Sequence, residues 1–248
     1  MRIFQKILAI VLVIASVISC SDDSDGKKSD SALKESIEGK WIVTSSSGRV
    51  SSDSYESFEF NLSGNFIIVI DGEVIFGIYE VIDDETIELE DYGTFKLVSV
   101  DGSSISFTFT PDSGDEITFT ADKAPQVENS SKTKLLCKTW ELVELDGEPV
   151  AGTDYELTVL FSDAGTYYVS ITGLATWQWK DNDETTICYS WEGDPTCTES
   201  NQAIIHELTN NKLVISDLLS DYELKPATNA GRKSKTSGVN FPKGIFHN

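Results

Sequence analysis

Apolar and polar residues alternate with a period of two along much of the chain. Residues 58–62 read Phe-Glu-Phe-Asn-Leu, and residues 105–110 and 117–120 read Ile-Ser-Phe-Thr-Phe-Thr and Ile-Thr-Phe-Thr. Alternation that uses β-branched and aromatic residues predicts strands that bury one face. Turn signals such as Asp101-Gly102 separate these runs and favour hairpins, because glycine tolerates positive φ. Apart from a short helical turn over residues 31–37, we therefore expect an all-β protein.

The body of the chain is an internal repeat. Trp41 opens one copy, and Trp140 opens a second copy 99 residues later. Two further motifs recur in the same order at shifts of 101 and 99 residues: Phe60-Asn-Leu-Ser-Gly64-Asn-Phe66 with Phe161-Ser-Asp-Ala-Gly165-Thr-Tyr167, and Asp84-Glu-Thr with Asp183-Glu-Thr. Three matches at nearly constant spacing indicate two copies of one structural unit.

Each copy contains about eight expected strands joined by short turns. An antiparallel sheet of this size avoids exposed edges by closing into a barrel, and sequential hairpins give up-and-down order. We therefore predict two tandem small antiparallel up-and-down β-barrels at residues 36–124 and 133–227, joined by a linker at residues 125–132. A pair of small β-sandwiches is the alternative architecture. The polar, basic stretch over residues 228–248 is expected to be a flexible tail.

The first twenty residues have the order of a secretory signal. Arg2 and Lys6 precede an uncharged apolar run at residues 7–18, which is shorter than the roughly 20 residues that span a bilayer. Residues 17–20, Val-Ile-Ser-Cys, resemble the lipobox of bacterial lipoproteins. The resemblance implies that residues 1–19 are removed and that the Cys20 thiol carries the lipid. An ordinary signal peptide with an accidental cysteine is the alternative.

Acidic residues follow Cys20 almost directly. Asp22, Asp23 and Asp25 resemble the export signal that sends lipoproteins of Bacteroidetes to the outer face of the outer membrane. The resemblance implies a protein anchored in the outer membrane by its lipid and facing the cell exterior, with residues 20–35 as an acidic tether. A solvated acidic linker without export information is the alternative.

The opening of the first copy resembles a known family of β-barrels. Gly39-x-Trp41, followed by the aromatic, turn, glycine and aromatic motif of residues 60–66, is similar to the lipocalin-like domains of Bacteroidetes lipoproteins. In the second copy Lys138 stands where the glycine would be. The resemblance implies a lipocalin-like binding or scaffolding protein, in which Trp41 and Trp140 close one end of each barrel.

The charge of the chain excludes one large class of partners. The sequence has 41 acidic and 19 basic residues and a net charge of −22, and loss of Arg2 and Lys6 with the signal would make it more negative. Such a surface repels nucleic acid and anionic lipid headgroups. We therefore expect no nucleic-acid partner, and contact with the membrane only through the lipid.

Three cysteines remain beyond Cys20. Cys188 and Cys197 flank a turn at Gly193-Asp-Pro that can bring them together, so we predict a disulfide between them, worth roughly 2.5–3 kcal/mol in the chain-entropy model. Cys137 is then expected to be a buried free thiol. With two histidines and no Cys-x-x-Cys pair, the chain lacks the ligand spacing of a metal site, and we expect neither metal nor cofactor.

Aromatic residues concentrate in the second copy. Trp177 and Trp179 share one face of a predicted strand, and Tyr189 and Trp191 follow in the next. One interpretation is an aromatic platform for a glycan or a small apolar ligand. The other is that the four rings fill the barrel core. The acidic residues within 181–184 lack the glycine and the distal glutamate of a calcium loop, and we expect them to form a solvated turn.

Two classes of function remain after these exclusions. The first is a non-catalytic binding module that holds a small apolar ligand or a glycan at the cell surface. The second is a structural or interaction module of an envelope complex. We do not expect an enzyme, because the sequence has no Gly-x-Ser-x-Gly elbow or comparable nucleophile motif and His206 lies in an ordinary strand pattern.

Overall fold

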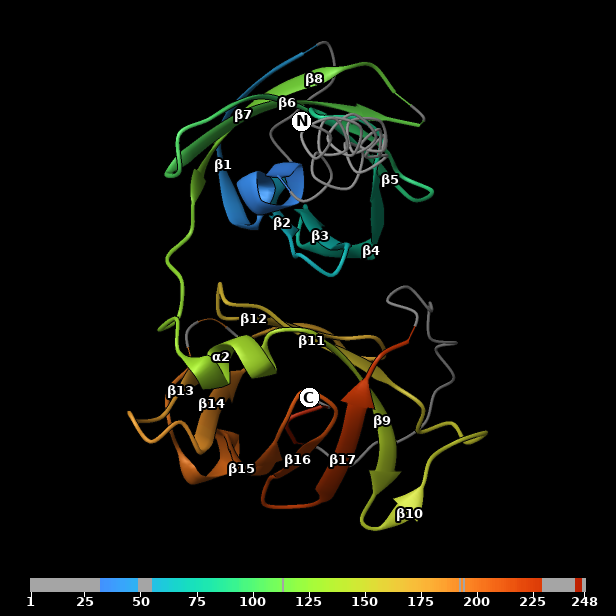
Figure 1. Cartoon of the computed structure of the whole chain (residues 1–248), viewed down its shortest axis with the longest axis vertical. Helices are drawn as coiled ribbons and strands as arrows, with labels where there is room; N and C mark the ends of the chain where they lie inside the picture. Colours follow the sequence, from blue (N-terminus) through green and yellow to red (C-terminus); the bar gives the residue numbers. More distant parts are fainter. Residues whose placement is uncertain are drawn as a thin grey trace, which may run out of the picture.

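The computed structural model describes residues 32–48, 55–112, 114–191, 193, 195–228 and 244–246. The predicted signal peptide, the lipidation at Cys20 and the acidic residues behind it lie outside the described residues. Within these ranges the chain folds into two β-barrels, with the first above the second in Figure 1. Among the same residues, no helix has the length and apolar character needed to cross a membrane.

The first barrel is a closed antiparallel sheet in which each strand pairs with its neighbours along the chain. The strand β1 closes the sheet by pairing with both β2 and β8. The strands of this barrel are β1 (Gly39–Gly48), β2 (Tyr55–Phe60), β3 (Asn65–Ile70), β4 (Glu73–Val81), β5 (Thr86–Leu89), β6 (Gly93–Val100), β7 (Ser104–Pro111) and β8 (Ile117–Lys123).

The second barrel repeats this order. Here β9 pairs with both β11 and β17, while the short β10 extends β9 as a hairpin. The strands are β9 (Thr139–Leu145), β10 (Glu148–Pro149), β11 (Thr158–Phe161), β12 (Thr166–Val169), β13 (Gly173–Trp179), β14 (Thr186–Ser190), β15 (Gln202–Leu208), β16 (Leu213–Ser216) and β17 (Asp221–Pro226), and the 3-10 turn η1 (Glu199–Asn201) precedes β15. The prediction of two tandem up-and-down barrels is confirmed, and the alternative of two sandwiches is wrong.

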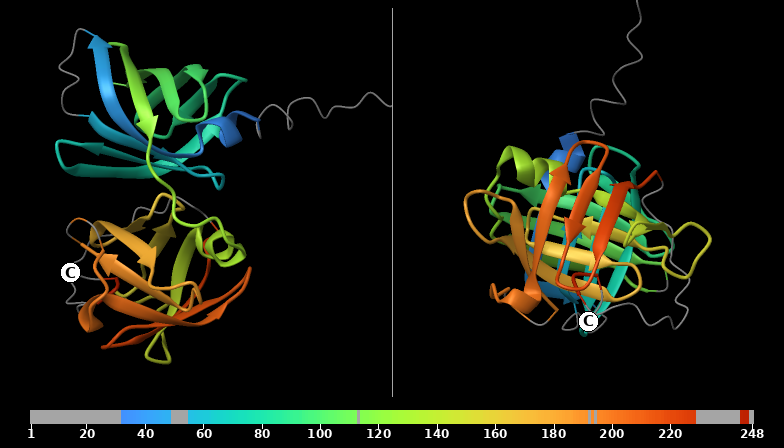
Figure 2. Two further views of the ribbon diagram at one scale, coloured as in Figure 1. Left: turned by 90° about the vertical axis from the view of Figure 1, so that its left-hand side faces the viewer. Right: turned by 90° about the horizontal axis from the view of Figure 1, so that it is seen from below.

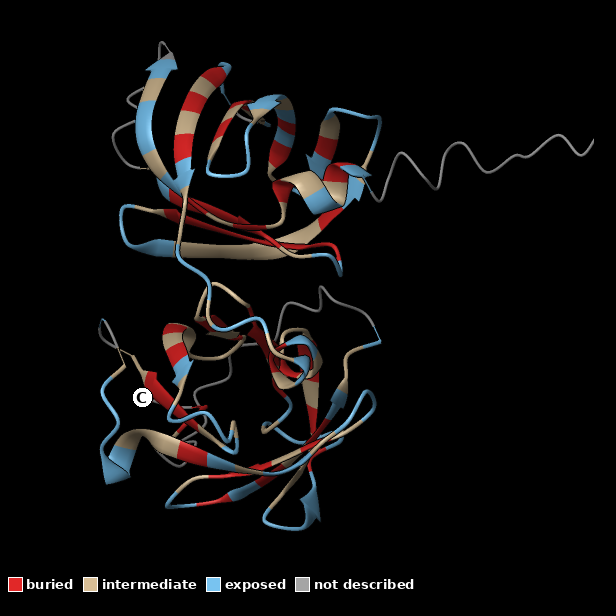
Figure 3. Cartoon of the chain, turned by 60° about the vertical axis from the view of Figure 1, so that its left-hand side comes forward, coloured by how far each residue is buried: buried red, intermediate tan, exposed pale blue. Residues whose placement is uncertain are grey.

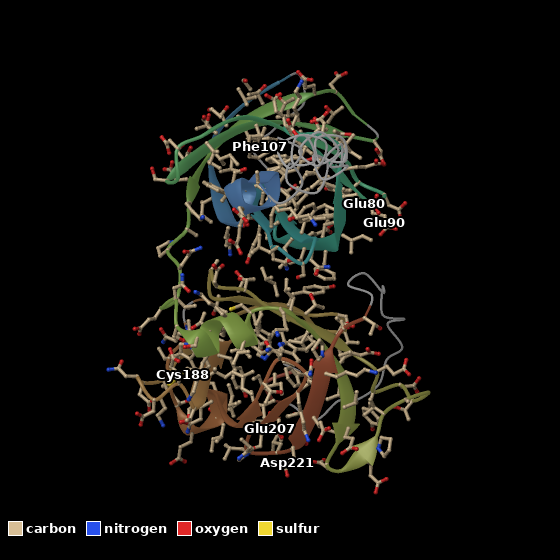
Figure 4. All side chains as sticks on the ribbon, viewed as in Figure 1. Glu80, Glu90, Phe107, Cys188, Glu207 and Asp221 are labelled. Atoms are coloured by element: carbon tan, nitrogen blue, oxygen red, sulfur yellow. A yellow bond between two sulfur atoms is a disulfide. The ribbon has the colours of Figure 1, made fainter. Side chains whose placement is uncertain are left out.

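Side chains that alternate between two faces build the core of each barrel. In the first barrel Phe107 is fully buried, and its ring stacks on Phe95 and Phe119 with ring centroids 4.4 and 5.3 Å away. Figure 4 shows Phe107 among the side chains that fill this barrel, whereas Glu80 lies at its outer edge. The period-two pattern of the sequence therefore corresponds to side chains that point in and out of a closed sheet.

A short helix packs beside the opening tryptophan of each barrel. Residues 32–37 form the first helix, and the Nε1 of Trp41 donates a hydrogen bond of 2.7 Å to the carbonyl of its last residue, Ile37. The helix α2 (Ser131–Leu136) repeats the arrangement, because Trp140 donates a bond of 2.8 Å to the Leu136 carbonyl. The sequence predicts a helical turn at the first position but not at α2, although both helices have six residues and neither is long enough to show a helical period by itself.

The two barrels meet through equivalent outer faces. Outward side chains of β3 and β4 pack against those of β11, β12 and β13, and the Phe76 and Tyr168 rings stack with centroids 4.5 Å apart. The Thr139 hydroxyl also donates a 2.8 Å hydrogen bond to the Asn65 side chain across the contact. Of the strands on this side of the first barrel, β3 is buried along nearly its whole length, whereas β4 is mostly of intermediate exposure, and Figure 3 shows buried and intermediate segments side by side here. Figure 2 shows the same stacking of the barrels from a second side.

The end of the chain departs from the predicted flexible tail at residues 244–246. Ile245 and Phe246 are fully buried and belong to the core cluster of the second barrel. Burial of two consecutive large apolar side chains contributes about 3–6 kcal/mol, which offsets much of the entropy cost of ordering a three-residue segment. The prediction for residues 228–248 is therefore wrong at these three residues.

Candidate functional site

The four aromatic residues of the second copy lie in or against the core of their barrel. Trp177 and Tyr189 are cross-strand neighbours on β13 and β14, and their side chains are 1% and 3% exposed. Trp179 and Trp191 are half-buried and pack against the same core. An open depression of about 520 Å³ between the segment 125–128 and β13 passes Trp179. Trp177 and Tyr189 thus offer almost no exposed ring surface to a ligand.

The polar atoms of these rings already have partners within the protein. The indole nitrogens of Trp177 and Trp179 donate to the Ser162 carbonyl and the Thr133 hydroxyl, each at 2.9 Å. The Tyr189 hydroxyl donates to a backbone carbonyl at 3.2 Å. These bonds connect β13 and β14 to neighbouring segments, as expected for aromatic side chains in a core.

The first barrel contains an aromatic residue at the place of Trp177. The amide of Tyr79 donates to the Gly64 carbonyl at 2.7 Å, and the amide of Trp177 donates to the Gly165 carbonyl at the same distance. A large ring at this position is a shared structural feature of both copies.

The remaining predicted residues are also placed by the structure. Cys188 and Cys197 form a disulfide with a Cα–Cα distance of 5.1 Å, and Cys137 is a half-buried free thiol. The acidic turn binds the start of α2, because the Ser130 hydroxyl donates to a Glu184 carboxylate oxygen at 2.8 Å. Within the described ranges, no group of three histidine, cysteine or acidic side chains is arranged to hold a metal ion.

The two barrels enclose a pocket of about 540 Å³ where their equivalent turns approach each other. We call it the interbarrel pocket. Residues 60–63 at the end of β2, residues 161–163 at the end of β11 and side chains of α2 line its wall. The Nδ2 of Asn61 and the Oγ of Ser162 are buried and have no hydrogen-bond partner in the described structure. Buried polar atoms without partners are rare and costly, and both atoms belong to residues that line the pocket.

Two acidic residues, Glu38 and Asp163, and two lysines, Lys134 and Lys138, line the interbarrel pocket. Burial raises the pKa of the Glu38 carboxyl, and the nearby Asp163 raises it further, while Lys123 acts in the opposite direction. Burial likewise raises the pKa of Asp163. The pKa of the Cys137 thiol is raised by burial first and then by these acids, so the sulfur is protonated at neutral pH.

Next to the pocket, Glu59 is buried in the contact between the barrels. Its side chain is 4% exposed, and its carboxylate oxygens have no partner with good hydrogen-bond geometry, although the Ser162 and Thr166 hydroxyls lie close enough to interact with them. Burial raises the pKa of Glu59, and this effect outweighs the lowering by Ser162, Lys40 and Thr166. The sequence analysis did not single out this residue, because a glutamate that alternates with phenylalanines in a strand is normally exposed to solvent.

Comparison of the chain with protein-family models, with curated proteins and with solved structures found no match in any of the three.

Proposed function

We propose that the protein is a lipid-anchored, lipocalin-like binding protein of the cell envelope that holds a small glycan in the interbarrel pocket. The volume of about 540 Å³ lies within the usual range for small-ligand sites, roughly 300–1,000 Å³. Both barrels contribute to the pocket wall, so a ligand there would contact the whole tandem unit. A packed structural module is the alternative function.

The observation that carries this proposal is the pair of unpartnered polar groups, one from each barrel. The Asn61 amide is a donor, and the Ser162 hydroxyl is both a donor and an acceptor. Both atoms are buried, so a ligand reaches them only when these side chains turn into the pocket. A sugar hydroxyl can then accept from the first and exchange a hydrogen bond with the second, which a purely apolar ligand cannot do. The exposed Leu62 side chain offers an apolar surface for the carbon face of a sugar ring. These groups favour a glycan over an apolar ligand.

Replacing Asn61 or Ser162 with alanine is expected to weaken glycan binding by about 10-fold for each change, because one hydrogen bond to a ligand is worth about 1–1.5 kcal/mol. The measurement is calorimetric titration of residues 21–248 with the best binder from a panel of mono- to trisaccharides. Asn210→Ala is a matched control, because Asn210 is exposed and lies outside the pocket lining. Absence of binding up to millimolar sugar, or equal affinity of both variants and the native chain, would instead support the structural module.

We further propose that the anchor is a lipid on Cys20 and that the protein resides on the outer face of the outer membrane. The support is the sequence pattern around Cys20, since this part lies outside the described residues. Changing Cys20 to alanine is expected to remove the acyl mass and to move most of the protein from the membrane fraction to the soluble fraction. Fractionation with mass spectrometry tests this, and a Cys20→Ala chain that stays in the membrane would contradict it.

A further inference from the structure

Three residues near the end of the chain occupy the interior of the second barrel. Gly244, Ile245 and Phe246 follow the last strand, β17, by many positions, yet Ile245 and Phe246 are fully buried. The Phe246 ring meets the Tyr222 ring edge-on with centroids 4.7 Å apart. We call these three residues the terminal segment.

Side chains of the barrel bind the backbone carbonyls of the terminal segment one after another. The Trp191 indole donates to the carbonyl of Gly244 at 3.3 Å, the Tyr167 hydroxyl donates to that of Ile245, and the Thr172 hydroxyl donates to that of Phe246 at 2.9 Å. Burial raises the pKa of Tyr167 well above its ordinary value, so its hydroxyl remains a donor at neutral pH. The barrel thus recognises the segment as a peptide, through its main chain.

Asp217 fixes the position of the terminal segment by accepting a hydrogen bond from its backbone. One oxygen, Oδ2, accepts the Ile245 amide at 2.8 Å and the Tyr222 hydroxyl at 3.1 Å. The other, Oδ1, accepts two backbone amides of the β16–β17 turn at 2.8 and 3.0 Å. A carboxylate held by four donors cannot move freely, so it sets both the register and the direction of the bound peptide.

The same carboxylate requires glycine at position 244. A Cβ added to Gly244 would lie 2.1 Å from the Oδ2 of Asp217, far inside van der Waals contact. Because that oxygen already accepts two hydrogen bonds, it cannot make room without losing them. The site is therefore expected to select peptides in which a glycine is followed by an aliphatic and then an aromatic residue.

The first barrel provides an internal comparison. At the place of Tyr167, which pairs with Phe161, it has Phe66, which pairs with Phe60. Phe66 fills the core but has no hydroxyl to offer a peptide carbonyl. The hydroxyl that binds Ile245 is therefore not needed to build a barrel of this kind, which points to a role in binding the segment.

We propose that the second barrel contains a peptide-binding site for segments of the pattern Gly-aliphatic-aromatic, and that the chain's own terminal segment fills it. A peptide of the same pattern from another chain would bind only when the terminal segment is absent or weakened, because an attached segment competes at an effective concentration on the order of millimolar. This site is separate from the interbarrel pocket, and the inference does not depend on the glycan proposal.

The test uses residues 21–248, which contain both complete barrels, and a variant that ends at residue 243. The probe is an acetylated, fluorescein-labelled peptide with the sequence of residues 243–248, followed by fluorescence anisotropy. We expect the shortened chain to bind the peptide at least 10-fold more tightly than the full chain. In the shortened chain, Tyr167→Phe should weaken binding about 5- to 10-fold, and a peptide with alanine in place of the glycine should lose most of its affinity.

A folded shortened chain that does not bind the peptide would overturn the proposal, as would equal affinity for the glycine and alanine peptides. Circular dichroism and protection of the Cys188–Cys197 disulfide from reduction report whether that chain is folded. If it does not fold, Phe246→Ala in the full-length chain weakens the competing segment without removing it. That variant must then bind the peptide more tightly than the native chain, and failure to do so would equally reject the site.

Discussion

Replacement of Trp140 with alanine is expected to lower the free energy of unfolding by about 3–5 kcal/mol, the usual cost of removing a buried tryptophan side chain. Trp140 is fully buried, and its indole nitrogen holds the Leu136 carbonyl at the end of α2. The change therefore leaves a large cavity and also removes one of the two donors to the Leu136 carbonyl, the other being the Lys138 amide. Because the whole stability of a domain is about 5–15 kcal/mol, the loss should be visible as a large shift of the urea midpoint.

Two further variants separate the cost of the cavity from the cost of the lost hydrogen bond and test the equivalent residue of the first barrel. Trp140→Phe keeps most of the volume and removes the hydrogen bond, so it should cost clearly less than the alanine variant. Trp41→Ala removes the equivalent side chain from the first barrel, where Trp41 binds Ile37 in the same way, and should cost a similar amount. A Trp140→Ala protein with an unchanged urea midpoint would show that the ring is not part of the stabilising core.

Replacement of Glu59 with glutamine is expected to stabilise the protein by about 1–3 kcal/mol at pH 8, because it removes the desolvation cost of a buried charge while keeping the size of the side chain. The folded-state pKa of Glu59 is raised by burial, so the folded protein prefers the protonated carboxyl. The stability associated with that proton is complete below the ordinary pKa of 4.5 and is lost as the pH rises through the higher folded pKa. Glutamine remains neutral throughout and avoids this loss.

Urea unfolding of the native chain and the Glu59→Gln variant at pH 4 and pH 8 measures this difference. We expect equal stabilities at pH 4 and a gain for the variant at pH 8. Glu90→Gln is the control, because Glu90 is exposed and lies at the outer side of the first barrel in Figure 4. A gain of the same size at both pH values would mean that the charge on Glu59 is not the cause.

Much of the fold can be predicted from local sequence, because each barrel is built from neighbouring hairpins. Alternation in runs such as residues 105–110 identified strands, and the recurrence of Trp41 at Trp140 identified the repeat. The contact between the barrels also leaves a signal in the sequence of β3. Residues 66–70 are apolar without interruption, which is typical of a strand buried on both faces.

Other features depend on contacts that no local pattern contains. The burial of Glu59 follows from the approach of the second barrel, which the sequence of β2 does not encode. The helix α2 begins at a capping serine, Ser130, that is one of many serines in the chain. The terminal segment is three residues long, too short for any periodicity, and its partners Asp217 and Tyr167 lie far from it in sequence. Such sites become visible only when the chain is folded.

The meeting of equivalent faces has a consequence for how the two halves can evolve and act. In a symmetric dimer of separate chains every substitution at the contact occurs twice, and dilution dissociates the pair. Here the halves are covalently joined, so their contact persists at any protein concentration, and each face can change alone. The position held by Glu59 in one half is held by the apolar Leu160 in the other. Because the two barrels are covalently linked, their equivalent faces can carry different side chains. One face of the contact has a buried carboxyl group where the other has an apolar side chain.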